Sequence, residues 1–137
     1  MKLTSIIALA SLTGLVSGTQ SASYDNTYDN AFGDMDSVAC SDGSHGLAWK
    51  YPTFGRLPTF PHIGGASVIG GWNSANCGTC WNLTFEGKSI LVTAIDHTGY
   101  GFNLAEAALN TLTDGNAEFY GVIQVDATQV AKSDCGL

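Results

Sequence analysis

From residue 38 onward the chain places short apolar segments between turn-forming residues, a pattern typical of short β-strands. The segment 90–95 is apolar at nearly every position, so we expect a strand that is buried on both faces. Glu86-Gly87, between two such segments, predicts a tight hairpin. The predicted strands are 37–40, 47–51, 67–72, 79–85, 89–96 and 120–125.

Two stretches differ from this pattern. Residues 51–65 contain three prolines, and we expect an irregular loop there because proline cannot donate to a central strand ladder. Residues 19–33 are polar and contain a short tandem of Tyr-Asp-Asn units. Their carboxylates lack the spacing of an EF-hand calcium loop, so a capped N-terminal turn is the better interpretation.

One amphipathic helix is predicted after Asn103, because apolar side chains then recur at helical spacing as far as Leu112. We expect Asn103 to cap this helix, Glu106 to return the capping bond, and Asp114-Gly115 to end it. Short strands with one or two helices favour a single domain, a small β-barrel with flanking helices.

The first segment resembles a secretory signal peptide. Lys2 precedes an apolar stretch over 3–16, and the small residues Ser17 and Gly18 follow. A membrane anchor or a buried helix is the alternative, but a bilayer span needs about 20 apolar residues. We therefore predict a signal peptide over 1–18, a mature domain over 19–137, secretion, and no membrane anchor.

Charge narrows the class of partner. The 137 residues include 12 acidic and 5 basic ones, for a formal charge of −7, and the sequence pI is about 4.5. Binding to nucleic acid or to an anionic membrane is disfavoured, because both need clustered Lys and Arg. The apolar fraction of 45% is that of a globular chain.

The four cysteines of a secreted chain indicate two disulfides, and they allow three pairings: Cys40, Cys77, Cys80 and Cys135. A thioredoxin-like Cys77/Cys80 redox pair lacks the expected βαβ pattern. A papain-like nucleophile at Cys80 would need a histidine much farther downstream than the chain extends. A zinc site is disfavoured because the cysteines do not form two short-spaced pairs. Structural bridges that take Cys77 and Cys80 to other partners are favoured.

Asp96 is the carboxylate with the most chemical interest, because it ends the most apolar predicted strand. There it could act as a general acid or bind sugar hydroxyls, and the structural alternative is that it caps a turn. Glycoside hydrolysis ordinarily needs a second carboxylate. The candidates Asp25, Asp29 and Asp42 all lie in turn-like contexts that explain them better.

The remaining candidate residues give weaker signals. The three histidines lack metal-ligand spacing and are interpreted as turn or packing residues: His45, His62 and His97. We expect Trp72 and Trp81 to pack against disulfides, and Trp49 to be the tryptophan to test for exposure as a sugar platform. Asn82 begins an Asn-Leu-Thr glycosylation sequon and is expected to point to solvent.

Taken in order along the mature chain, these residues resemble the cerato-platanin family. The segments that carry the resemblance are Ser23-Tyr24-Asp25, Ala39-Cys40-Ser41-Asp42-Gly43, His45-Gly46-Leu47, Tyr51-Pro52-Thr53, Phe60-Pro61-His62-Ile63-Gly64-Gly65, Gly71-Trp72-Asn73-Ser74, Cys77-Gly78-Thr79-Cys80-Trp81, Ala94-Ile95-Asp96-His97, Gly101-Phe102-Asn103 and Gln129-Val130 with Cys135.

The resemblance implies a small secreted fungal protein, mainly β with small helices, built as a six-stranded double-ψ β-barrel like the first domain of expansins. It implies the pairing Cys40–Cys77 and Cys80–Cys135. It also implies no hydrolytic activity, hence no catalytic residues, and neither a cofactor nor a metal.

For function, the resemblance implies binding of chitin and N-acetylglucosamine oligomers, a place in the fungal cell wall or medium, loosening of cellulose without hydrolysis, and elicitation of plant defences through host surface components. The matching groove positions are Asp96, Asn103 and Lys50, the last where a relative has glutamine. The protein is expected to be a monomer or to self-associate weakly. The alternatives are a weak endoglucanase and an amphiphilic surface-active wall protein, the latter suggested by the charged fraction of 12%.

Overall fold

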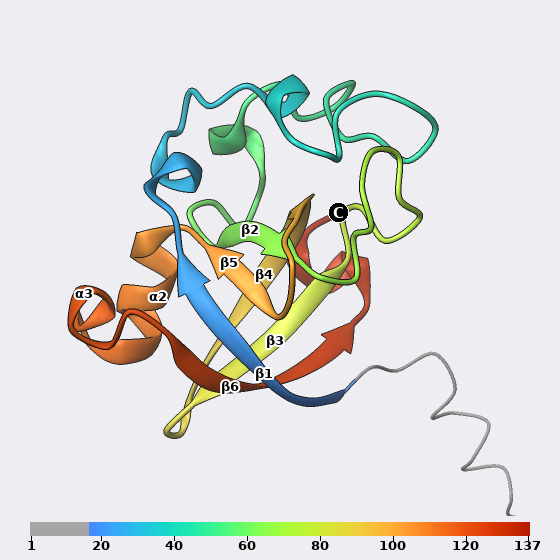
Figure 1. Cartoon of the computed structure of the whole chain (residues 1–137). Coiled ribbons are helices and arrows are strands. Elements are labelled where there is room, and N and C mark those ends of the chain that lie inside the picture. The colour runs from blue at the N-terminus through green and yellow to red at the C-terminus, as the bar shows by residue number, and fades with distance from the viewer. Residues whose placement is uncertain (1–16) are drawn as a thin grey trace, which may run out of the picture.

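The computed structural model describes residues 17–137, and six strands within that range close into a barrel in the order β1-β5-β2-β4-β3-β6 (Figure 1). The pairs β1–β5 and β2–β4 are parallel and the other four pairs are antiparallel. The six-stranded barrel predicted for the chain is confirmed. The strands are β1 Ser17–Tyr24, β2 Ile63–Ala66, β3 Cys80–Phe85, β4 Lys88–His97, β5 Phe102–Leu104 and β6 Ile123–Val130.

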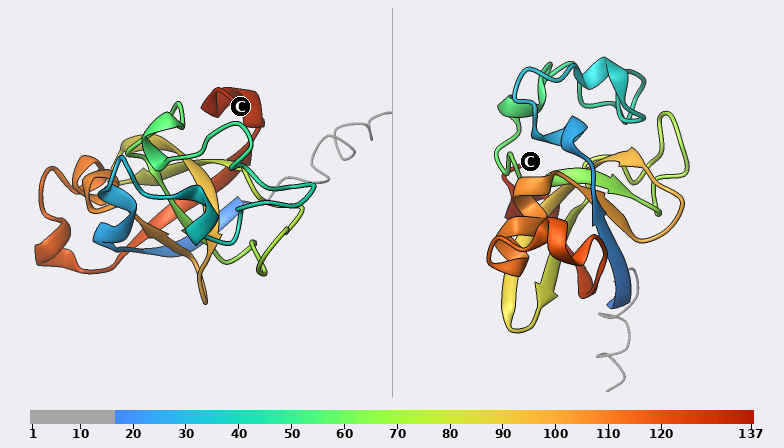
Figure 2. Two further views of the ribbon diagram at one scale, coloured as in Figure 1. Left: turned by 90° about the horizontal axis from the view of Figure 1, so that it is seen from above. Right: turned by 60° about the vertical axis from the view of Figure 1, so that its left-hand side comes forward.

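Short helices flank the barrel. In Figure 1, α2 (Glu106–Thr113) and α3 (Ala117–Tyr120) lie side by side against one flank of it. The long connection from β1 to β2 passes over one end of the barrel, as both views of Figure 2 show. It and the C-terminal segment carry four 3₁₀ turns: η1 Asn26–Asp29, η2 Met35–Ser37, η3 Phe54–Arg56 and η4 Lys132–Cys135.

Most of the predicted leader, residues 1–16, lies outside the described residues. The expected cleavage point after Gly18 falls within β1, where Ser17 pairs with Thr128 and Gly18 with Ala127 of β6. The boundary between leader and mature domain stays a prediction.

The hairpin and the apolar strand are confirmed. Glu86 and Gly87 join β3 to β4 with φ angles of 48° and 83°, the left-handed pair that a two-residue hairpin requires. In β4 the segment 90–95 is buried at every position except the half-buried Leu91.

Three of the predicted strands are wrong. The segments 37–40, 47–51 and 67–72 belong to connections, and the true strands β1, β2 and β5 were not predicted. Strand β2 has the sequence Ile-Gly-Gly-Ala, which is unfavourable for a strand. Its first glycine, Gly64, is required because the backbone of β5 packs closely against it. A Cβ on Gly64 would lie 2.3 Å from the carbonyl oxygen of Asn103 in β5.

Two element boundaries are also corrected. The predicted strand 120–125 begins instead at Ile123, because Tyr120 still belongs to α3, and it continues to Val130.

The predicted helix cap is also corrected. Asn103 lies in β5 and does not cap the helix, since α2 begins at Glu106. The carboxylate of Asp29 caps α2 instead, accepting the backbone N–H groups of Glu106 and Ala107 at 2.8 and 2.9 Å. The end of the helix is as predicted, since Asp114 takes the left-handed conformation with φ 54°.

The disulfides pair as the family resemblance implied, Cys40 with Cys77 and Cys80 with Cys135. Their sequence separations of 37 and 55 residues make each worth about 4 kcal/mol in the chain-entropy model. Trp81 is buried as expected and packs edge-to-face on Phe102, with ring centroids 5.4 Å apart. The prediction for Trp72 is wrong: it is 63% exposed.

Candidate functional site

Four neighbouring strands bring one residue each into register across the barrel wall. Ser23 of β1 pairs with Asn103 of β5, Asn103 with Gly65 of β2, and Gly65 with Asp96 of β4. Residues paired in register share a face of a sheet. Their chain neighbours Leu104 and Ile95 are buried in the core, so this row lies on the outer face. We call Ser23, Asn103, Gly65 and Asp96 the polar row.

One half of the polar row opens onto a hollow. Ser23 Oγ donates to Asn103 Oδ1 at 3.1 Å, and Gly65 adds no side chain between Asn103 and Asp96. A hollow of about 340 Å³ adjoins this half, and one wall carries Tyr100, which is 80% exposed. Its lining residues are Ser21, Ser23, Thr98, Gly99, Tyr100, Asn103 and Val122.

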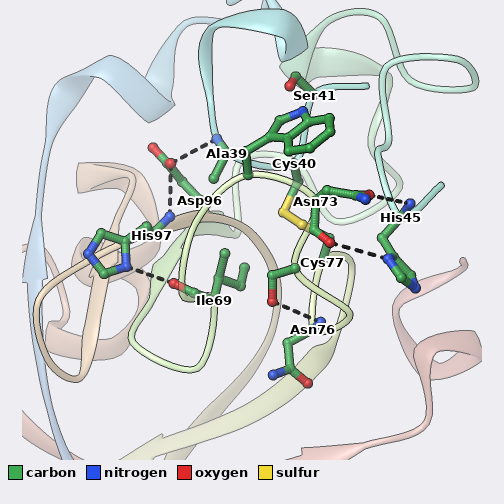
Figure 3. Close-up of a disulfide and its surroundings, with 12 residues drawn as sticks. Ala39, Cys40, Ser41, His45, Ile69, Asn73, Asn76, Cys77, Asp96 and His97 are labelled. Atoms are coloured by element: carbon green, nitrogen blue, oxygen red, sulfur yellow. Dashed lines mark hydrogen bonds between the residues drawn. A yellow bond between two sulfur atoms is a disulfide. The ribbon is translucent and has the colours of Figure 1, made fainter. Parts of the chain in front are cut away.

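At the other half, three donors hold the carboxylate of Asp96. Its Oδ1 accepts the N–H groups of Ala39 and His97 at 3.0 and 2.8 Å, as Figure 3 shows. Its Oδ2 accepts the hydroxyl of Tyr28 at 2.7 Å. Burial, reinforced by this bond to Asp96, raises the pKa of Tyr28, so the phenol stays a neutral donor. Asp96 therefore acts as an acceptor, fixed in one orientation.

The Cys40–Cys77 disulfide (Figure 3) explains how a loop reaches Asp96. Cys40 N donates to Ile95 O at 3.1 Å, and Gly78 N, next to Cys77, donates to Ala94 O at 2.9 Å, so the chain is held against β4 at both ends of the bridge. This places the N–H of Ala39, the residue before Cys40, within reach of the Asp96 carboxylate. The disulfide thus supports the site as well as the fold.

The other carboxylates considered for acid–base work are engaged elsewhere. Asp25 caps η1 by accepting the N–H of Thr27 at 2.9 Å. Asp29 caps α2, as described above, and Asp42 accepts the indole N–H of Trp72 at 2.6 Å. Asp25 makes the local interaction that its turn-like context predicted, whereas the partners of Asp29 and Asp42 lie far away in the sequence.

Lys50 is placed differently from Asp96 and Asn103. It lines a second hollow of about 170 Å³, which shares no lining residue with the hollow beside Asn103. Trp49, next to it, is the tryptophan that the sequence singled out as a candidate sugar platform, and its side chain is 80% exposed.

Of the predicted site residues, the structure therefore brings together Asp96 and Asn103. It adds Ser23, Tyr28 and Tyr100, which sequence reasoning missed. No local signal marks them, since their proximity depends on strand register and on the fold of η1.

The histidines make turn and packing contacts, and the described residues 17–137 hold no group of three or more side chains suited to a metal ion. His45 N donates to Asn73 Oδ1 at 2.8 Å, and His97 Nδ1 lies 2.7 Å from Ile69 O. Burial lowers the pKa of His62.

The sequon residue Asn82 is half-exposed on β3, and its glycosylation stays a prediction. Within the described range, no helix has the length and apolar character to cross a membrane.

The small closed barrel, held in this chain by two disulfides, is a fold found in other protein structures as well, an expansin among them. An expansin from Clavibacter michiganensis shares the fold, with a TM-score of 0.51 and 20% identity over 85% of this chain and 51% of that one.

The family model named Cerato-platanin matches residues 20–137, and the chain belongs to this family. It is similar to cerato-platanin 2 from M. perniciosa, with 54% identity, a TM-score of 0.86, and coverage of 88% of this chain and 100% of that one. It is also similar to the solution structure of the fungal elicitor Cerato-Platanin, with 44% identity and a TM-score of 0.77, over 84% of this chain and 95% of that one.

A curated relative, the heat-stable 19 kDa antigen of Coccidioides posadasii, is 45% identical over 96% of this chain and 90% of its own length. Family membership and two disulfides together indicate a secreted protein.

Proposed function

We propose that the protein binds chitin and N-acetylglucosamine oligomers through the polar row, without hydrolysing them. The observation that carries the proposal is the line of Ser23, Asn103 and Asp96 beside a hollow walled by the exposed ring of Tyr100. A hydroxyl, an amide and a carboxylate suit the hydroxyl and acetamide groups of a neutral sugar, and an aromatic face suits its C–H face. A neutral polymer also meets no charge repulsion from an acidic protein.

Asp96 keeps room for one ligand contact. An ionised carboxylate offers about four acceptor sites, and Tyr28, Ala39 and His97 occupy three of them. A sugar hydroxyl can donate to the fourth. Because the carboxylate is already fixed, binding costs little side-chain entropy.

The absence of hydrolysis is part of the proposal. Glycoside hydrolysis ordinarily uses an acid and a base or nucleophile about 5–10 Å apart. Asp96 acts as an acceptor, while Asp25 caps a turn, Asp29 caps α2 and Asp42 binds the indole of Trp72. This arrangement favours binding over catalysis.

The biological setting follows from the family. One similar structure is that of a fungal elicitor, and the barrel is shared with an expansin. We therefore propose secretion after cleavage at Gly18, a place in the fungal cell wall, loosening of cellulose without bond cleavage, and perception by plant surface components as a defence elicitor.

A second candidate, surface activity, has one observation in its favour. Several large apolar side chains are strongly exposed: Phe32, Trp49, Trp72, Tyr100 and Phe119. Surface tension measured at micromolar protein concentration tests it, and an unchanged value would remove it.

Calorimetric titration with a chitin tetramer tests the main proposal, comparing wild type with Asp96→Ala, Asn103→Ala and the exposed control Asp36→Asn. Loss of a hydrogen bond to a charged group is worth about 1.5–3 kcal/mol, so Asp96→Ala should weaken binding about 10-fold or more. The control should bind as wild type does. Equal affinity of all four proteins would remove the polar row from the site, and reducing ends released from swollen cellulose would contradict the non-catalytic assignment.

A further inference from the structure

A second hollow gathers positive charge in an otherwise acidic protein. We call it the lysine hollow; its lining residues are Leu47, Trp49, Lys50, Tyr51, Gly78, Lys132 and Leu137. Residues 17–137 contain four basic residues, and two of them line this one hollow. No Asp or Glu side chain does so. The local charge is therefore opposite in sign to the net charge of −7.

Within residues 17–137, neither lysine of the hollow forms an ion pair with a carboxylate. The ion pair found in the described part of the chain joins Lys88 to Asp114, and no carboxylate there, the α-carboxylate of Leu137 included, pairs with Lys50 or Lys132. Unpaired ammonium groups on one surface attract an anion, and a carboxylate between two of them gains charge-assisted hydrogen bonds from both.

Both ammonium groups retain donors for a ligand. Lys132 Nζ donates to the carbonyl oxygen of Cys77 at 3.2 Å, which fixes the side chain and leaves two of its three N–H donors free. Lys50 Nζ lies 5.5 Å from the centroid of the Tyr51 ring, a contact that orients it without using a conventional acceptor.

The other residues that line the hollow are apolar or aromatic. The side chains of Leu47 and Leu137 both lie close to Gly78, where an added Cβ would be 3.3 Å from each of them. Trp49 is 80% exposed, so a broad aromatic face stands unburied beside the two lysines. An aromatic face binds the C–H face of a pyranose ring, whereas a bare inorganic anion would gain nothing from it.

We infer that the lysine hollow binds a uronic-acid unit of an acidic polysaccharide, with the carboxylate between Lys50 and Lys132 and the sugar ring on Trp49. A volume of about 170 Å³ is below the ~300–1,000 Å³ of pockets that enclose drug-sized ligands, and it suits a single sugar ring of a longer polymer. This site differs from the polar row in place and in ligand charge, so neither depends on the other.

Titration of the isotope-labelled protein with trigalacturonate, followed by NMR, tests the inference. The expected amide shifts fall on residues 47–51, 78 and 132–137, and the neutral methyl ester of the same trisaccharide should bind at least 5-fold more weakly. Lys50→Gln, Lys132→Gln and Trp49→Ala should each weaken binding at least 5-fold. The matched control Lys88→Gln removes an ammonium group outside the hollow and should stay within 2-fold of wild type.

Several results would overturn the assignment. They are shifts outside the hollow, equal binding of acid and ester, equal weakening by Lys88→Gln, or tighter binding of an acidic peptide at the same residues. Lys132→Gln alters a bond to the backbone, so its fold is checked by thermal unfolding. Lys50→Gln removes no described hydrogen bond and stays decisive. Asp96→Ala should leave trigalacturonate affinity unchanged, which separates this inference from the proposed chitin site.

Discussion

The polar row and the lysine hollow are both surface sites, but their side chains are held in opposite ways. In the polar row, Asp96 accepts three hydrogen bonds and Asn103 accepts one from Ser23. In the lysine hollow, Trp49 is exposed and Lys50 has no ion-pair partner among the described residues. The comparison teaches that the hydrogen bonds of the polar row also stabilise the fold, whereas, within residues 17–137, Trp49 and Lys50 of the lysine hollow make no such bonds through their side chains and can contact a ligand. Mutations should therefore separate the two regions.

The largest effect is expected from removing the bridge beneath the row. Cys40→Ser with Cys77→Ser should lower the free energy of unfolding by about 2–5 kcal/mol and weaken chitin binding, because the N–H of Ala39 is no longer held on Asp96. Urea unfolding and calorimetric titration measure the two losses. The control is Cys80→Ser with Cys135→Ser, which should cost similar stability but less affinity. Equal affinity losses would break the proposed link between bridge and row.

The next effect is expected from Asp96 itself. Asp96→Ala leaves three donors without their acceptor and should cost about 3 kcal/mol of unfolding free energy. Asp96→Asn, which keeps one carbonyl acceptor, should cost less. Denaturant unfolding of both variants measures the difference. A cost below 0.5 kcal/mol for Asp96→Ala would show that the carboxylate does not stabilise the fold.

A smaller effect with a distinctive pH dependence is expected from Tyr28. Removing its hydroxyl in Tyr28→Phe should cost about 1 kcal/mol near pH 7. Burial and Asp96 raise the pKa of Tyr28 above the usual 10.0, so the folded state holds this proton more tightly than the unfolded chain does. Its contribution is complete below about pH 10 and falls as the pH rises further.

Stability measured from pH 8 to 12 checks the sign of this effect. Tyr28→Phe should lose less unfolding free energy above pH 10 than wild type does. Tyr100→Phe, at an exposed ring, is the matched control and should follow wild type. Parallel curves for wild type and Tyr28→Phe would contradict the role of the buried phenol.

The smallest effects are expected in the lysine hollow. Trp49→Ala and Lys50→Gln should each change the free energy of unfolding by no more than about 0.5 kcal/mol, as exposed positions usually do. The same denaturant series measures this. A loss above 1 kcal/mol for Lys50→Gln would mean that the hollow, like the row, contributes to the stability of the fold.

Local sequence was sufficient where neighbouring residues decide the structure. Glu86-Gly87 specified the hairpin, the apolar run specified β4, and Asp114 ended α2, because turn conformations and burial patterns depend on residues close in the chain. The family resemblance supplied the disulfide pairing and the barrel, and it pointed to Asp96 and Asn103, whose role as groove residues stays a prediction.

Only the tertiary structure decided the contacts between distant segments. Asp29 caps α2 from 77 residues away, Gly64 gives β2 its close approach to β5, and Lys50 and Lys132 line the same hollow. A barrel closes by pairing strands that are far apart in sequence, and that register places Ser23, Asn103, Gly65 and Asp96 in one row. The local sequence around each residue does not determine this register, because contacts between segments far apart in the chain decide which strands pair.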